Sequence, residues 1–187
     1  MSSKPGTRHA VVTGLLVMSC IASAAYADDV GDANQTIRTF KKTDPGLARF
    51  FNSSVGYAVF PSVAKGGLGL GAAHGSGVLY ERGAPVGRAS LTQVTVGAQI
   101  GGQEYTEIIF FETDKVLSDF KSGNFAFSAQ VSSVALAAGA SANANYQRGV
   151  AVFTATKGGL MLEASVGGQK FSYTPFAKKK VSQRRTP

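Results

Sequence analysis

Residues 56–71 read GYAVFPSVAKGGLGLG, and this stretch decides the fold class of the chain. Its residues alternate with a period of two, which predicts a β-strand. Within it, Gly67, Gly69 and Gly71 fall on one face, opposite the leucines between them. A bare glycine face lets another backbone approach closely or lets a sheet bend sharply. The stretch therefore predicts a strand that is bent or closely packed on one side.

The period of two returns along most of the chain after residue 71. Further strands are expected at 75–80, 90–100, 104–112, 125–131, 149–156, 159–166 and 170–174. Turns are expected at 81–85 and at Gly101-Gly102, where turn-forming residues cluster. Short turns without long crossover helices favour antiparallel pairing. We expect a mainly β (α+β) domain built on a curved antiparallel sheet, either barrel-like or a sandwich.

Short helices are expected before the sheet and once in the middle of the chain. Ile37 and Phe40 lie three apart among basic residues, which predicts an amphipathic helix over 34–42. Asp44-Pro45 combines a cap with a first-turn proline, so a second helix is expected to end near Asn52. Residues 113–121 predict a third helix, of about two turns.

The first 27 residues have the pattern of a secretory signal peptide. A basic start is followed by an apolar run over 10–25, and Ala25-Tyr26-Ala27 ends it. The uninterrupted apolar part is shorter than the ~20 residues that a spanning helix needs. We expect cleavage after Ala27, a linker over 28–33 and export, to the periplasm or the outer membrane. A second possibility is lipoprotein processing at Cys20, because residues 16–20 resemble such a site.

The positive charge of the chain is concentrated at its C-terminal end. The formal net charge is +8, and five basic residues fall within 177–187: Lys178, Lys179, Lys180, Arg184 and Arg185. We expect this segment to be a disordered basic tail, which leaves the rest of the domain nearly neutral. A nearly neutral body without a basic face argues against a nucleic-acid partner.

The sequence provides few groups for catalysis. After cleavage at Ala27 the chain has one histidine, His74 in an expected turn, and no cysteine. A nucleophile elbow and metal-ligand spacings are both missing. Four acidic residues, Glu104, Glu107, Glu112 and Asp114, are expected to be edge or turn charges. We therefore expect a protein without enzymatic activity, catalytic residues, metal or cofactor.

Residues 56–71, continued by 75–80, closely resemble the SYLF domain family, also called the yeast-type actin-regulator domain. Further matching segments follow in the same order, at 83–87, 96–103, 108–114 and 157–161. The resemblance covers about residues 34–174, so we expect one SYLF-like domain over 34–176.

The resemblance implies a lipid-binding module with an anionic lipid or membrane surface as its partner. Some eukaryotic members are similar to phosphoinositide-binding modules, and some act on actin. By position, the residues implied to contact lipid are Arg38, Phe40, Lys41, Lys42, Arg49 and the motif lysine Lys65. Two alternatives stay open: a small outer-membrane β-barrel, and a periplasmic structural or interaction protein.

Overall fold

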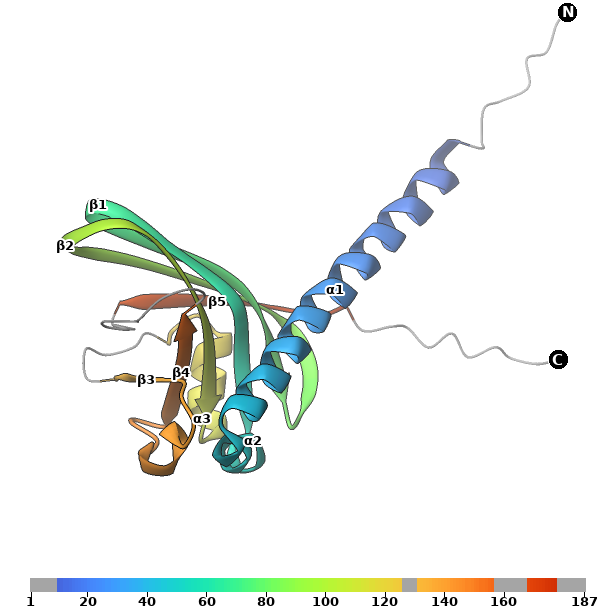
Figure 1. The fold of residues 1–187 in the computed structure, drawn as a ribbon. Helices are drawn as coiled ribbons and strands as arrows, with labels where there is room; N and C mark the ends of the chain where they lie inside the picture. Colours follow the sequence, from blue (N-terminus) through green and yellow to red (C-terminus); the bar gives the residue numbers. More distant parts are fainter. Residues whose placement is uncertain (1–9, 126–130, 157–167, 178–187) are drawn as a thin grey trace, which may run out of the picture.

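The computed structural model describes residues 10–125, 131–156 and 168–177 (Figure 1). Its helices are α1 (Ala10–Thr43), the short 3-10 helix η1 (Pro45–Leu47), α2 (Ala48–Ser53), α3 (Asp114–Lys121) and the 3-10 helix η2 (Ala140–Asn143). Its strands are β1 (Gly56–Glu81), β2 (Ala84–Phe111), β3 (Ser133–Ala135), β4 (Val150–Thr156) and β5 (Gln169–Pro175). The strand expected at 159–166, most of that at 125–131 and the tail from residue 178 lie outside the described residues.

One long hairpin, bent double, dominates the fold. β1 and β2 pair antiparallel from Gly56–Phe111 at the open end to Glu81–Ala84 at the turn. Figure 1 shows that the hairpin bends back near its middle. We call residues 56–66 with 102–111 the first arm, and residues 71–81 with 84–95 the second arm.

Glycine allows the two arms to approach closely. A Cβ atom added at Gly77 would lie 2.7 Å from Phe60 Cδ1, and one added at Gly75 would lie 2.8 Å from Val63 Cγ2. Both distances are too short for a real side chain, so this part of β1 contacts its own earlier residues only because it lacks side chains. This close approach lies at Gly75 and Gly77, beyond the glycines at 67–71 for which it was expected.

The long strands correct the expectation of several short ones. Gly101 and Gly102 were expected to form a turn, but they lie within β2, opposite Gly67 and Gly66. Paired glycines let a ladder bend without ending it, which a pattern of turn residues does not distinguish from a true turn. The turn expected at 81–85 is confirmed, with positive φ angles at Arg82 (48°) and Gly83 (81°).

The remaining strands extend the hairpin on both arms. β4 pairs antiparallel with β2 in the first arm, and β5 pairs antiparallel with β2 in the second. β3 runs parallel to β4, which makes the sheet mixed and corrects the expectation of antiparallel pairing throughout. The mainly β class with a curved sheet is confirmed. The described strands do not close on themselves, whereas the outer-membrane alternative requires a closed sheet.

Helix α1 is one continuous helix where a linker and a short helix were expected. Residues 28–33 are helical because Val30 and Ala33 continue the stripe of Ile37 and Phe40, and this stripe packs on the sheet. Within the described ranges, no helix combines the length and the apolar character needed to cross a bilayer. The mid-chain helix α3 is confirmed, and Thr113 Oγ1 caps it by accepting a hydrogen bond from the Val116 N–H.

Two apolar clusters hold the structure together. The inner cluster lies between the arms, α3 and β5, and includes Phe60, Ile109, Phe111, Phe120 and Phe171. The outer cluster lies between the sheet and the segment from α1 to α2. It includes Phe40, Leu47, Phe50, Phe110 and Phe153. Because burial of apolar area is the main stabilising term, these clusters fix α1 against the outer side of the hairpin.

Candidate functional site

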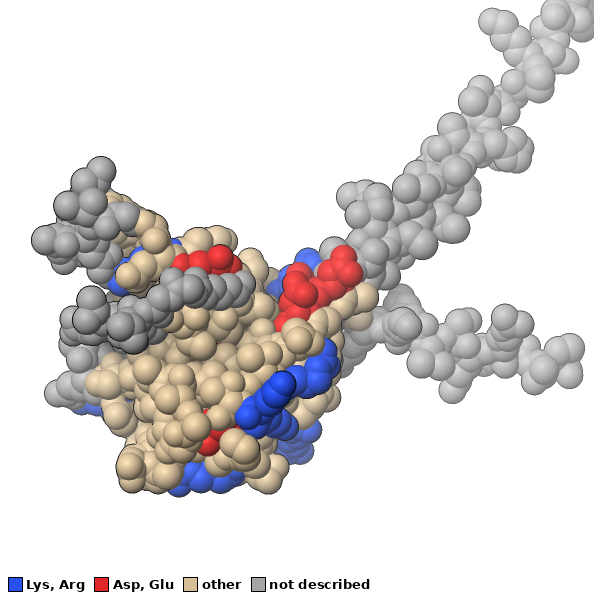
Figure 2. Space-filling view, in the orientation of Figure 1, with Lys and Arg blue, Asp and Glu red and all other residues tan. Residues whose placement is uncertain are grey.

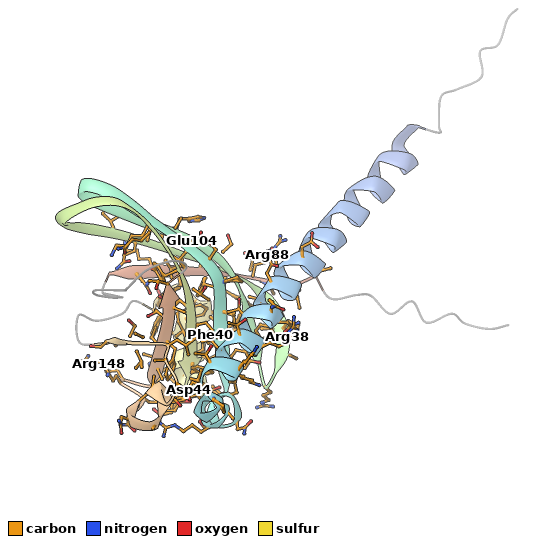
Figure 3. The ribbon with its side chains drawn as sticks, in the orientation of Figure 1. Arg38, Phe40, Asp44, Arg88, Glu104 and Arg148 are labelled. Carbon is orange, nitrogen blue, oxygen red and sulfur yellow. The ribbon has the colours of Figure 1, made fainter. Side chains whose placement is uncertain are left out.

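The C-terminal half of α1 presents a basic face. Arg38, Lys41 and Lys42 are exposed and follow the i, i+3, i+4 spacing that places side chains on one side of a helix. Figure 2 shows their positive charge along the part of α1 nearest the body, and Figure 3 shows Arg38 on the outward side of the helix. Arg38 donates to Gln35 Oε1 at 2.6 Å, and the Lys41 Nζ lies 4.3 Å from the Phe51 ring centroid. We call Arg38, Lys41 and Lys42 the basic face.

The opposite side of the same helix is buried, which changes the role of Phe40. Its side chain is 1% exposed and belongs to the outer cluster, together with Ala33. Phe40 was implied to contact lipid; its ring packs in the outer cluster, and the residue also lines a hollow beside α1. Its contribution is to fix the helix so that the basic face points outward.

Arg49 is held by backbone groups rather than left free for a ligand. Its guanidinium donates to the carbonyl oxygens of Ser141, at 2.5 Å, and of Ala144, and it lies 4.5 Å from the Phe50 ring centroid. These contacts tie α2 to η2. The geometry therefore supports a structural role for Arg49.

Lys65 lies apart from the basic face. It lies two residues after Val63 and so shares its strand face, and because the Val63 side chain is in the inner cluster, Lys65 points to the side of β1 away from α1. Its strand neighbour Ala64 lines a hollow beside α1, which agrees with this alternation. The structure thus brings Arg38, Lys41 and Lys42 together and leaves Lys65 on the other face of the sheet.

A groove runs beside residues 29–40 of α1. It consists of three adjoining hollows. The first two, of about 470 and 350 Å³, share Asp32 and Ser62. The third, of about 330 Å³, shares Asp29 and Ser76 with the second. Asp29 pairs with Arg88 at 2.5 Å. Figure 2 shows acidic atoms on this part of α1, above the basic ones. The acidic residues therefore precede the basic ones along α1, and Lys41 and Lys42 in the last turn match the helix dipole.

His74 lies in this groove but without a catalytic arrangement. It is exposed in β1, opposite Thr92, and not in the expected turn. Within the described residues there is no group of three or more His, Cys, Asp or Glu that could hold a metal ion.

One acidic residue corrects the sequence interpretation. Glu107 was expected at an edge or turn, yet its side chain is 0% exposed in β2. It shares a strand face with Tyr105 and Ile109, both of which are buried. That alternation was the signal that could have placed Glu107 in the interior, because charge alone suggested the surface. Burial raises the pKa of Glu107 to about 7.

Comparisons with known proteins identify the family. The family model Ysc84, described as Las17-binding protein actin regulator, matches residues 92–184. Beta cell expansion factor A from Aeromonas veronii is 30% identical over 138 residues, which are 72% of this chain and 51% of that protein. The chain thus spans about half the length of this curated relative. The family model and the relative together show that the chain belongs to the SYLF family.

Proposed function

We propose that this protein binds anionic lipid surfaces through the basic face of α1. The observation that carries the proposal is the outward position of Arg38, Lys41 and Lys42 on a helix whose other side is fixed in the core. Among the described residues, no carboxylate forms a salt bridge with these three side chains. They are therefore available to phosphate groups on a membrane.

The expected affinity is modest and electrostatic. A basic residue near an anionic membrane contributes about 1 kcal/mol, so three would contribute about 3 kcal/mol. Such attraction is screened by salt over a Debye length of about 8 Å at physiological ionic strength. The five basic residues of the C-terminal tail would add to it if the tail reaches the same surface.

Family membership supports this proposal, because the SYLF family suggests a lipid-binding or actin-regulator-like module. The signal-peptide pattern at residues 1–27 favours the lipid alternative, since an exported protein does not meet cytoplasmic actin. We infer an exported, non-enzymatic protein that associates with a periplasmic or outer-membrane surface.

Vesicle flotation tests the proposal directly. The full chain would be mixed with phosphatidylcholine vesicles, with or without phosphatidylglycerol, at low and at high salt. We expect recovery only with anionic vesicles and loss of recovery at high salt. Lys41→Gln combined with Lys42→Gln should weaken binding about thirtyfold, because two charges contribute about 2 kcal/mol. Deletion of residues 178–187 would measure the contribution of the tail separately.

A matched double variant controls for net charge. Lys115 and Lys170 are exposed on α3 and β5, so Lys115→Gln with Lys170→Gln removes the same charge elsewhere. This control should bind anionic vesicles nearly as well as the natural chain. Equal weakening by both double variants would show that net charge, and not the basic face, determines binding.

A further inference from the structure

A fully buried carboxyl group links the two arms of the hairpin. Glu107 lies in the first arm, and Gln169 begins β5, which pairs with the second arm opposite Gln93. Glu107 and Gln169 are both 0% exposed. Gln169 Nε2 donates to Glu107 Oε2 at 3.1 Å. This hydrogen bond therefore links the first arm to the strand that pairs with the second arm. The sheet hydrogen bonds connect these two segments only by way of the bend in the hairpin.

Two oxygen atoms of the same pair are left over. Glu107 Oε1 and Gln169 Oε1 are buried and have no hydrogen-bond partner among the described residues. A buried polar atom without a partner costs about 1–3 kcal/mol. As a carboxylate, Glu107 has only acceptor atoms, so it cannot satisfy the amide oxygen of Gln169. As a carboxylic acid it gains one O–H donor, and a single proton then satisfies both oxygens.

We propose that Glu107 is protonated in the folded protein and forms a cyclic acid–amide pair with Gln169, a proton-dependent lock between the two arms. In this pair, Gln169 Nε2–H donates to Glu107 Oε2, and Glu107 Oε1–H donates to Gln169 Oε1. Loss of the proton removes one hydrogen bond and sets a carboxylate oxygen against an amide oxygen. The arms are then held together less firmly.

The groups packed around Glu107 are uncharged or stay neutral, so Glu107 is the group that titrates there. Phe60 faces it from β1 and Thr154 from β4, and neither is charged. Tyr105 on its own strand is titratable, but burial and the nearby Glu107 raise the pKa of Tyr105, which keeps its hydroxyl neutral. Gln169 Nε2 also lies 3.4 Å from Tyr105 Oη, as its second acceptor. No basic side chain among the described residues contributes to the pKa of Glu107.

The direction of the pH effect follows from this burial. Desolvation raises the pKa of Glu107 from 4.5 to about 7, and the Gln169 hydrogen bond opposes part of that rise. Between these two values the folded chain binds more protons than the unfolded chain, so stability falls as pH rises. The unfolding equilibrium constant is expected to rise about tenfold between pH 6 and pH 8 from this group alone.

Urea unfolding of the full chain at pH 6 and pH 8 tests the lock. Glu107→Gln keeps the shape and replaces the O–H donor with an N–H donor, so both hydrogen bonds persist at every pH. We expect the tenfold rise in the natural chain and its loss in Glu107→Gln, which should also be the more stable protein at pH 8. Glu104→Gln is the control, because Glu104 is exposed on the same strand. It should keep the natural pH dependence.

Carbon-13 NMR of the glutamate carboxyl groups provides a measurement that needs no variant. One carboxyl should titrate about two units above the others. If all glutamates titrate near 4.5, or if Glu107→Gln unfolds with the natural pH dependence, the proposal fails. A comparison of sodium chloride with tetramethylammonium chloride at pH 8 and equal ionic strength gives a further test. The proposal also fails if the choice of salt changes the stability of the natural chain but not that of Glu107→Gln. That result would place a cation, and not a proton, in the pair.

Discussion

Two buried carboxyl groups in this protein have opposite surroundings. Asp44 lies at the junction of α1 and η1, where it accepts from the backbone N–H groups of Gly46, at 3.0 Å, and Ser141, at 2.7 Å (Figure 3). Glu107 lies between the arms of the hairpin and accepts from the side-chain amide of Gln169. Both side chains are 1% exposed or less. Asp44 nevertheless lies just beneath the surface of the protein, whereas Glu107 lies deep in its interior.

The two carboxyl groups differ both in depth and in the supply of N–H donors. Burial raises the pKa of Asp44, but the hydrogen bonds from Ser141 and Gly46 outweigh it, so the net pKa is lowered. Glu107 receives too little compensation, and burial raises its pKa. The stability that Asp44 contributes is present above its unfolded pKa and is lost as pH falls through its folded pKa. For Glu107 the sign is reversed, and stability is lost as pH rises.

The largest expected change in the free energy of unfolding comes from adding a side chain between the two arms that surround Glu107. Gly77→Ala adds a Cβ atom 2.7 Å from Phe60 Cδ1 and 3.0 Å from the Val59 carbonyl carbon. We expect a loss of about 3 kcal/mol, because overpacking against backbone cannot relax cheaply. Urea unfolding would measure it. Gly102→Ala is the control, because only the Lys65 oxygen lies nearby, at 3.8 Å. Equal losses would mean that the arms do not pack closely.

The next effect tests the Asp44 side of the comparison. Asp44→Ala leaves the Ser141 and Gly46 N–H groups without this acceptor, so we expect a loss of about 2 kcal/mol at pH 7. The loss should shrink as pH falls towards 3, because the unfolded chain then binds a proton at Asp44 that the lowered pKa of the folded chain resists. Thermal unfolding between pH 3 and pH 7 would follow it. A loss that stays constant over this range would show that the charge of Asp44 is irrelevant.

A smaller effect is expected at Arg49, which ties α2 to the η2 segment that Asp44 also contacts. Arg49→Gln removes the hydrogen bonds to Ser141 and Ala144. We expect a loss of about 1 kcal/mol in stability, while binding to anionic vesicles stays close to that of the natural chain. Loss of vesicle binding without loss of stability would return Arg49 to the lipid-contacting set.

The smallest effect is expected from removing residues 1–27. Among the described side chains of α1, Asp29 pairs with Arg88 and Val30 packs on the outer cluster. A chain that starts at Asp28 should therefore unfold within about 0.5 kcal/mol of the full chain and keep both titrations. A larger loss would show that the removed residues help to support α1.

Local pattern was sufficient for much of the protein. The period of two predicted a curved, mainly β domain, and the motif at 56–71 pointed to the SYLF family. The caps at Asp44 and Thr113 placed the helices that follow them, because a cap acts through neighbouring residues. The i, i+3, i+4 spacing of Arg38, Lys41 and Lys42 also placed them together, because helical geometry is local.

The relation between distant segments required the tertiary structure. The sequence by itself determined which residues alternate, which glycines lack side chains and which helix is amphipathic. Only the folded chain decided that Gly101-Gly102 bends a strand instead of ending it, that Phe40 faces the core, and that Glu107 meets Gln169. The physical reason is that burial and hydrogen bonding of these groups depend on partners far along the chain, and no local period encodes such partners.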